Sequence, residues 1–278
     1  MPRSYPLLPT MSNLEIKPCH IGIVFALGIE SGGLEDLLSG SIRIRGSGFV
    51  IIEGGLKGRR VVIVRSGAGR ENAARATSTL IDGHKPKIII SAGFAGGLSL
   101  SLKSHGILLA NSVIDSTGRK IILDQTALSP DNSNEGRILQ CPLAHFPFDQ
   151  SKLNWPNLYI GKLLSVDHVI REPSEKKSLH QQHQALAVDM ETFAVAEVCC
   201  NRGVPLCAIR VIHDAADDAL PADIERLLRQ KTEAARLGAA LGAIWRRPGS
   251  IKDLWAMKEK SLICSTQLAK FISQLIEQ

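Results

Sequence analysis

The chain has 278 residues, of which 44% are hydrophobic and 22% charged, so it is large enough to fold around a sizeable hydrophobic core. Its net charge of +6 is scattered along the chain, and no basic stripe is interleaved with aromatic residues, so we expect no nucleic-acid partner. No apolar stretch reaches the roughly 18 residues that a membrane-spanning helix needs.

The N-terminal segment and the cysteines indicate the compartment. Residues 1–18 contain several prolines and lack the apolar core of a signal peptide, so we expect a disordered leader. The six cysteines form no CxxC pair, which favours buried thiols in a reducing compartment over a disulfide framework or a metal site. We therefore predict a cytoplasmic protein with no bound metal and no organic cofactor.

Strands and helices are expected to alternate along the chain. The uncharged apolar run at 20–27 predicts a first strand that is buried on both faces, with Glu30 at its tip. Further strands are predicted at 42–56, 59–65, 87–91, 106–114, 120–123, 158–166 and 206–212, with another ending at Asp189. Helices are predicted at 70–82, 173–184 (a polar helix or a mobile lid), 192–202, 228–246 and 250–278, and loops with one weak helix at 124–156.

This alternation predicts one α/β domain over residues 19–247, with a mixed, mainly parallel central sheet flanked by helices. Turns rich in glycine and other small residues are expected after two strands, at 66–69 and 92–98, where they let backbone approach a ligand. Ligands of open α/β sheets bind at the carboxyl ends of the strands, so we look for the site there.

The last segment, 250–278, has apolar residues at helical spacing with lysines among them, which predicts an amphipathic helix. One interpretation is a helix that packs on its own domain or on a second subunit. The alternative is a basic helix that makes peripheral contact with a membrane surface.

Three carboxylates are expected to meet at the ligand-binding edge. Glu191 and Asp214 follow two strands that one helix connects, Glu30 follows the first strand, and Arg210 lies four residues before Asp214. When carboxylates are held close together in a partly dry pocket, their pKa values move apart, so that one acts as an acid while another stays a base. Taken alone, these residues predict a hydrolase or a transferase that acts on a polar small molecule.

Four segments, at 21–31, 66–74, 92–115 and 187–217, together resemble the nucleoside phosphorylase superfamily and occur in its order. The pattern is most similar to the methylthioadenosine/S-adenosylhomocysteine nucleosidases. The segment 187–217 is the specific one, because its spacing from Glu191 to Asp214 equals theirs. The resemblance implies cleavage of the N-glycosidic bond of a purine nucleoside, most simply a 5′-modified adenosine, with release of adenine.

The resemblance also implies a role for each acidic residue. Asp214 would hold the purine and protonate its N7, and Glu191 would bind the ribose 2′- and 3′-hydroxyls with Met190 packed on the sugar. Glu30 would be the base that activates water, and Arg210 would orient or neutralise the acidic residues. The transition state would resemble an oxocarbenium ion, which anionic residues stabilise electrostatically.

The remaining expected substrate contacts include departures from the family pattern. Val169 and Ile170 fall where the family lines the base pocket, with Val169 in place of a stacking aromatic residue. Gly93 and Phe94 lie in the glycine turn, and Phe94 replaces a serine that contacts the nucleophile or phosphate. His213 replaces another serine, next to the acidic Asp214.

A second resemblance is to the hopanoid-biosynthesis-associated branch of the superfamily. The run 214–221 and the basic turn at 246–249 carry it. It implies phosphorolytic cleavage of adenosylhopane, with inorganic phosphate as co-substrate. Hydrolysis and phosphorolysis both stay open, and so does a catalytically silent protein that only binds a nucleoside. Family members imply a homodimer or a larger homo-oligomer.

Overall fold

The computed structural model describes residues 19–46, 48–123, 138–140, 153–220 and 250–278. Within these ranges one mixed sheet contains eleven strands. Its strands are β1 Ile21–Phe25, β2 Ser39–Gly46, β3 Phe49–Leu56, β4 Arg59–Arg65, β5 Ile88–Gly97, β6 Ile107–Asp115, β7 Lys120–Ile122, β8 Ile138–Gln140, β9 Leu158–Ser165, β10 Ala187–Asp189 and β11 Leu206–Asp214. The described helices are α1 Gly28–Glu35, α2 Arg70–His84, α3 Pro173–His183, α4 Thr192–Arg202 and α7 Ser250–Glu277.

Parallel pairing dominates the middle of the sheet. Strand β1 lies between β4 and β5 and is parallel to both, and β11 is parallel to β5. Antiparallel pairs join β11 to β6, and β2 to β3 to β4. The prediction of a single α/β domain with a mixed sheet is confirmed.

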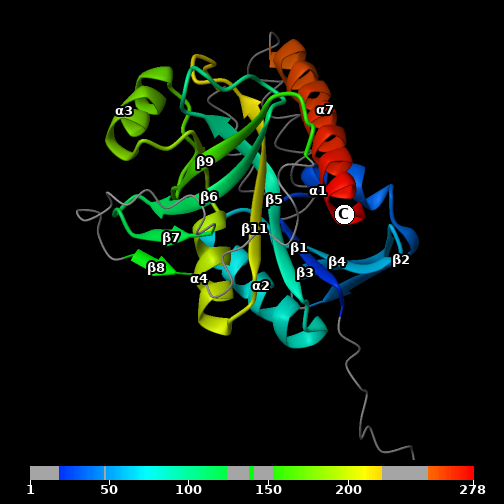
Figure 1. The fold of residues 1–278 in the computed structure, drawn as a ribbon. Helices are drawn as coiled ribbons and strands as arrows, with labels where there is room; N and C mark the ends of the chain where they lie inside the picture. The colour runs from blue at the N-terminus through cyan, green and yellow to red at the C-terminus, as the bar shows by residue number, and fades with distance from the viewer. Residues whose placement is uncertain (1–18, 47, 124–137, 141–152, 221–249) are drawn as a thin grey trace, which may run out of the picture.

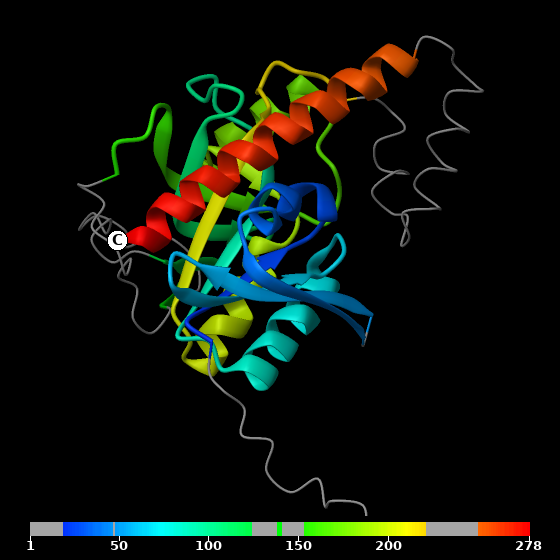
Figure 2. The ribbon, with the colours of Figure 1, turned by 90° about the vertical axis from the view of Figure 1, so that its right-hand side faces the viewer.

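Helices cover the sheet on both faces (Figures 1 and 2). On one face, α2 and α4 bury small and apolar side chains, such as Leu80 and Phe193, against the strands. On the other face, α1 and α7 pack together and bury Leu34, Leu268 and Phe271. Because both faces are covered, the central strands are rich in apolar residues and largely buried, as in β11, where every residue is buried, including Arg210, His213 and Asp214.

The structure corrects three expected elements. The stretch 42–56 is two strands, β2 and β3, and the reversal between them includes Gly48 with a φ of 83°, which favours glycine. The glycine turn at 92–98 is instead largely strand, because β10 and β11 pair with β5 as far as Gly96 and Gly97. Within the expected loops at 124–156, three residues form β8 beside β7. The predicted leader 1–18 and helix 228–246 lie outside the described residues.

The C-terminal helix packs on its own domain. Cys264, Leu268, Phe271 and Ile272 are fully buried against the sheet and α1, so the apolar face of this half of α7 is not available to a membrane. Ser265 also connects α7 to α1, because its hydroxyl donates to the carbonyl of Glu30 (3.2 Å) and accepts the N–H of Gly33 (2.9 Å). No helix in the described part of the chain is long and apolar enough to cross a membrane.

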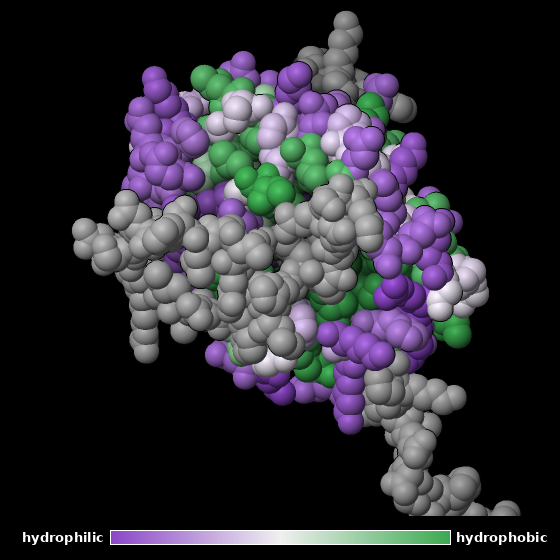
Figure 3. Space-filling model, in the orientation of Figure 1, coloured by the Kyte–Doolittle hydropathy of each residue, from purple (hydrophilic) through white to green (hydrophobic). Residues whose placement is uncertain are grey.

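The helix α3 confirms the polar helix predicted at 173–184, and its outer surface is hydrophilic (upper left of Figure 3). One of its lysines departs from this pattern. Lys176 is fully buried, whereas its neighbour Lys177 is exposed.

Candidate active site

A cavity of about 210 Å³ opens at the carboxyl ends of β1, β5, β10 and β11. Eight residues predicted from the sequence line it: Glu30, Phe94, Val169, Ile170, Met190, Glu191, His213 and Asp214. Gly93 and Arg210 lie outside this lining and border a smaller adjoining space of about 10 Å³ beneath Glu30 and Glu191. The structure therefore brings together residues from both ends of the chain at the predicted sheet edge.

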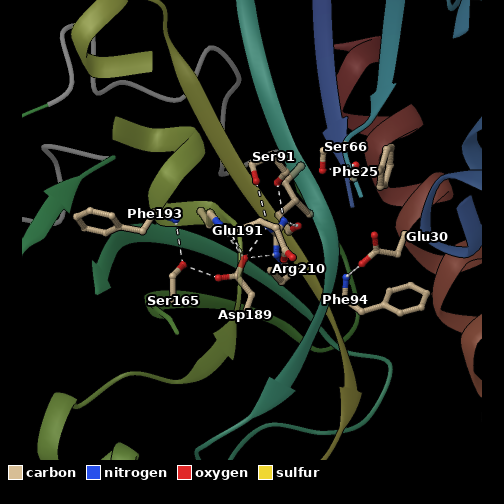
Figure 4. A network of polar contacts seen from close by, with 12 residues as sticks. Phe25, Glu30, Ser66, Ser91, Phe94, Ser165, Asp189, Glu191, Phe193 and Arg210 are labelled. Carbon is tan, nitrogen blue, oxygen red and sulfur yellow. Dashed lines mark hydrogen bonds and ion pairs between the residues drawn. The ribbon is translucent and has the colours of Figure 1, made fainter. Parts of the chain in front are cut away.

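Glu30 is fixed by the first turn of α1 and by β5. Its Oε2 accepts the N–H of Leu27 at 2.7 Å. Its Oε1 accepts the N–H of Phe94 at 2.9 Å (Figure 4). Burial raises the pKa of the Glu30 carboxyl, and the N–H groups of Phe94 and Leu27 oppose that shift. A carboxyl held in this way is suited to take a proton from a water molecule in the cavity.

The glycines of β5 make room for the Glu30 carboxylate. An added Cβ at Gly93 would lie 2.8 Å from Glu30 Oε1, and one at Gly96 would lie 3.1 Å from Asp214 Oδ2. Gly93 and Gly96 therefore allow two acidic side chains to approach a strand closely, and they do not form a turn.

Glu191 immediately precedes α4 and accepts the N–H of Gly69 at 2.7 Å. Gly69 has a φ of 98°, so the Ser66–Gly69 turn depends on glycine to aim this N–H at the carboxylate. Burial, followed by the negative charges of Asp189 and Glu30, raises the pKa of Glu191 to about 8, against the effects of the Gly69 N–H and Arg210.

Asp214 ends β11 and forms an ion pair with Lys176, whose Nζ lies 2.5 Å from Oδ2. The same ammonium group donates to the carbonyls of Ala215 (2.7 Å) and Asp218 (2.8 Å), so each of its three hydrogens has an acceptor. Sequence reasoning missed Lys176, because only the long-range contact with β11 distinguishes it from Lys177.

Arg210 lies beneath the cavity and is held by Asp189, which sequence reasoning also missed as a site residue. Its Nε and Nη2 lie 3.0 and 2.8 Å from Asp189 Oδ2, and it donates to both the carbonyl (2.9 Å) and the hydroxyl (3.0 Å) of Ser91 (Figure 4). Asp189 also accepts the N–H of Thr192 at 3.0 Å. The positive charge of Arg210 is therefore largely balanced by Asp189 below the acidic side chains.

The rest of the cavity wall is mainly apolar. The rings of Phe94 and His213 stack with centroids 5.4 Å apart. Helix α7 adds Met257 and Ser261, two lining residues that sequence reasoning missed because it treated 250–278 as a packing or membrane helix. Flat or apolar ligand groups fit such a wall, while polar groups of the ligand are left to the acidic residues.

No cluster of three or more His, Cys, Asp or Glu side chains that could hold a metal ion occurs in the described ranges.

Comparisons with known proteins agree with this geometry. The model of the family described as the phosphorylase superfamily matches residues 20–244. The 5′-methylthioadenosine/S-adenosylhomocysteine nucleosidase of Staphylococcus haemolyticus is 30% identical over 226 residues, covering 77% of this chain and 95% of that protein.

Solved structures show the same fold. The 5′-methylthioadenosine/S-adenosylhomocysteine nucleosidase of Neisseria meningitidis, solved with methylthio-immucillin-A, superposes with a TM-score of 0.65 at 20% identity, covering 93% of this chain and 98% of that one. The S-adenosylhomocysteine nucleosidase of Streptococcus pyogenes gives a TM-score of 0.65 at 17% identity, covering 94% and 97%. The sequence resemblance is thus confirmed, and the chain belongs to the phosphorylase superfamily.

Proposed function

We propose that this protein cleaves the N-glycosidic bond of a 5′-substituted adenosine by hydrolysis and releases adenine. One observation carries the proposal: Glu30, Glu191 and Asp214, which lie far apart in the sequence, line one cavity at the carboxyl ends of the strands. The relative of 30% identity, a 5′-methylthioadenosine/S-adenosylhomocysteine nucleosidase, supports the choice of substrate.

Each carboxylate has a task in this reaction. Asp214 delivers a proton to N7 of the purine, so that the base leaves as a neutral molecule. Glu191 accepts hydrogen bonds from the ribose hydroxyls, and the acidic groups around the sugar stabilise the positive charge that develops on it. Glu30 removes a proton from the water that attacks C1′.

The charges around the cavity favour water over phosphate as the nucleophile. The described residues that line the main cavity include no lysine or arginine. Arg210, in the adjoining space, is already paired with Asp189. Phosphate sites are built from cations and free N–H groups, and here the N–H of Phe94 is bonded to Glu30.

The test is to incubate the protein with methylthioadenosine, S-adenosylhomocysteine, adenosine and inosine, with and without phosphate, and to measure the released base by chromatography. We expect adenine from the 5′-thio substrates at a rate that does not depend on phosphate. Release that requires phosphate would establish phosphorolysis, the alternative that the hopanoid branch implies. Binding of every nucleoside without release of any base would identify a silent binding protein.

The role of the acid has its own test. Asp214→Asn keeps the shape of the side chain but cannot donate the proton, so we expect kcat to fall by about 10²–10⁴-fold. Unchanged kcat in this variant would contradict the assignment of Asp214. The proposal includes a homodimer or larger homo-oligomer in the cytoplasm, and light scattering of the purified protein measures the oligomeric state.

A further inference from the structure

His213 has contacts that the proposed reaction does not yet use. It is 8% exposed and lies in the cavity wall between Phe94 and Asp214. One ring nitrogen, Nε2, is 3.0 Å from the hydroxyl of Ser261, and the other, Nδ1, is 3.7 Å from Asp214 Oδ1. The histidine is therefore positioned by a residue of α7 and directed at the oxygen of the proposed acid.

The hydrogen bonds of Ser261 fix which nitrogen of His213 carries a hydrogen. The Ser261 hydroxyl donates its single hydrogen to the carbonyl of Met257 at 2.8 Å, so it accepts from His213 Nε2–H. In a neutral ring Nδ1 is then an acceptor, and it faces the acceptor oxygen of Asp214. A proton added at Nδ1 converts this unfavourable pair into an ion pair.

Lys176 decides which oxygen of Asp214 can work with His213. It binds Oδ2 and has no exposed surface, so Oδ1 is the oxygen left for His213 and a substrate. In the ion pair with Lys176, Oδ2 accepts a hydrogen bond and is not the source of a proton for the purine. The Lys176 ammonium is also a poor source of that proton, because two backbone carbonyls accept its other hydrogens.

We propose that His213 stores the proton that Asp214 delivers to N7 of the leaving purine, an inference that rests on the proposed function. His213 Nδ1 and Asp214 Oδ1, which lie 3.7 Å apart, come within hydrogen-bonding distance when substrate binds; the Nδ1–H bond of His213 then breaks and an O–H bond forms at Asp214 Oδ1. That O–H bond then breaks as N7–H forms, while the electron pair of the C1′–N9 bond passes to the purine. Water adds to C1′ and gives its proton to Glu30. Solvent then takes the proton of Glu30 and reprotonates His213.

The other ionisable groups around His213 do not compete for this role. Burial, Lys260 and His213 itself lower the pKa of His105, which favours its neutral form. Lys260 is paired with Asp218 at 3.1 Å, and burial raises the pKa of the Cys264 thiol to about 12. Asp214 is thus the acidic group that faces Nδ1.

The test compares His213→Gln with wild type on two leaving groups. Glutamine can keep the hydrogen bond to Ser261 but cannot store a proton. We expect kcat for methylthioadenosine to fall by about 10²-fold. Cleavage of the matching 5-methylthio-ribofuranoside of 4-nitrophenol should be nearly unchanged, because nitrophenolate leaves without protonation. His105→Gln, the same change at a neighbouring half-buried histidine outside the cavity lining, should behave as wild type.

The pH profile separates proton storage from a structural role. As pH falls, solvent can supply more readily the proton that His213 stores in wild type, so the activity of His213→Gln relative to wild type should rise. An equal loss on both substrates at every pH, or no loss on methylthioadenosine, would overturn the proposal. His213→Asn, measured in the same way, replaces His213→Gln if that variant does not fold. A wild-type protein that cleaves neither substrate would instead refute the proposed function, and the inference with it.

Discussion

Replacing Arg210 by methionine should lower the free energy of unfolding by about 3–5 kcal/mol, because it leaves a buried carboxylate without its cation. The side chains of Arg210 and Asp189 are 3% and 1% exposed, and their closest atoms are 2.8 Å apart. Methionine has a similar volume but no N–H groups that could donate hydrogen bonds to Asp189 and Ser91. For a chain of this size the loss corresponds to a fall in Tm of roughly 10 °C, which circular dichroism measures during heating.

An exposed ion pair gives the matched control. Arg202 pairs with Asp82 at 3.0 Å, and their side chains are 48% and 59% exposed. Arg202→Met should therefore cost less than about 1 kcal/mol. The double variant Asp189→Asn/Arg210→Met should lose less than the sum of its single variants, since it removes the unpaired charge. If Arg210→Met matches wild type in stability but loses activity, Arg210 acts on the substrate. Its proposed role as the cation that neutralises Asp189 would then be wrong.

Two further changes test the acidic site. The pKa of Glu191 is raised from 4.5 to about 8, so the folded state holds this proton more tightly than the unfolded state. Its contribution to stability is present below about pH 4.5 and is lost as pH rises to about 8, so the Tm of wild type should fall relative to Glu191→Gln over that window; a constant difference would contradict the shift. Gly93→Ala, whose Cβ would meet Glu30 Oε1 at 2.8 Å, should reduce kcat at least about tenfold by displacing the base. Gly32→Ala in α1, which meets nothing within 4 Å, should keep full activity and gain about 0.5–1 kcal/mol in unfolding experiments; equal activities in the two alanine variants would refute the crowding argument.

The sequence predicts the acidic residues of the site because their positions follow from local pattern. Glu30 and Asp214 follow β1 and β11, which are both parallel to β5, so these strand ends meet at one edge. Glu191 also lies where an apolar run ends, and its strand β10 reaches the same edge although it is antiparallel to β5. The glycine-rich stretch after 91 was wrongly predicted as a turn for a related reason. Glycine often ends a strand, but here cross-strand pairing to β10 and β11 overrides that local preference.

Other parts of the site depend on contacts that no local pattern contains. Lys176 and Ser261 belong to helices whose sequences show only polar or amphipathic character, and their partners are 38 and 48 residues away. Asp189 was visible at a strand end, but its pairing with Arg210 required the register of β10 and β11 against β5. Long-range pairing thus decides which charged residues face the cavity and which support it from below.

The contact between Ser265 and α1 has a consequence for biosynthesis. The helix that carries Glu30 is made before α7, yet its backbone at Glu30 and Gly33 is held by Ser265, which follows Gly33 by 232 residues. A chain emerging from the ribosome can form the β1–β4–β5 sheet and the contacts of Glu30 with Leu27 and Phe94 early, but the backbone of α1 gains its bonds to Ser265 only after α7 has been made. Proteolysis that removes α7 would therefore yield a protein that still carries Glu30, Glu191 and Asp214 but lacks the contacts that hold the backbone of α1 at Glu30 and Gly33.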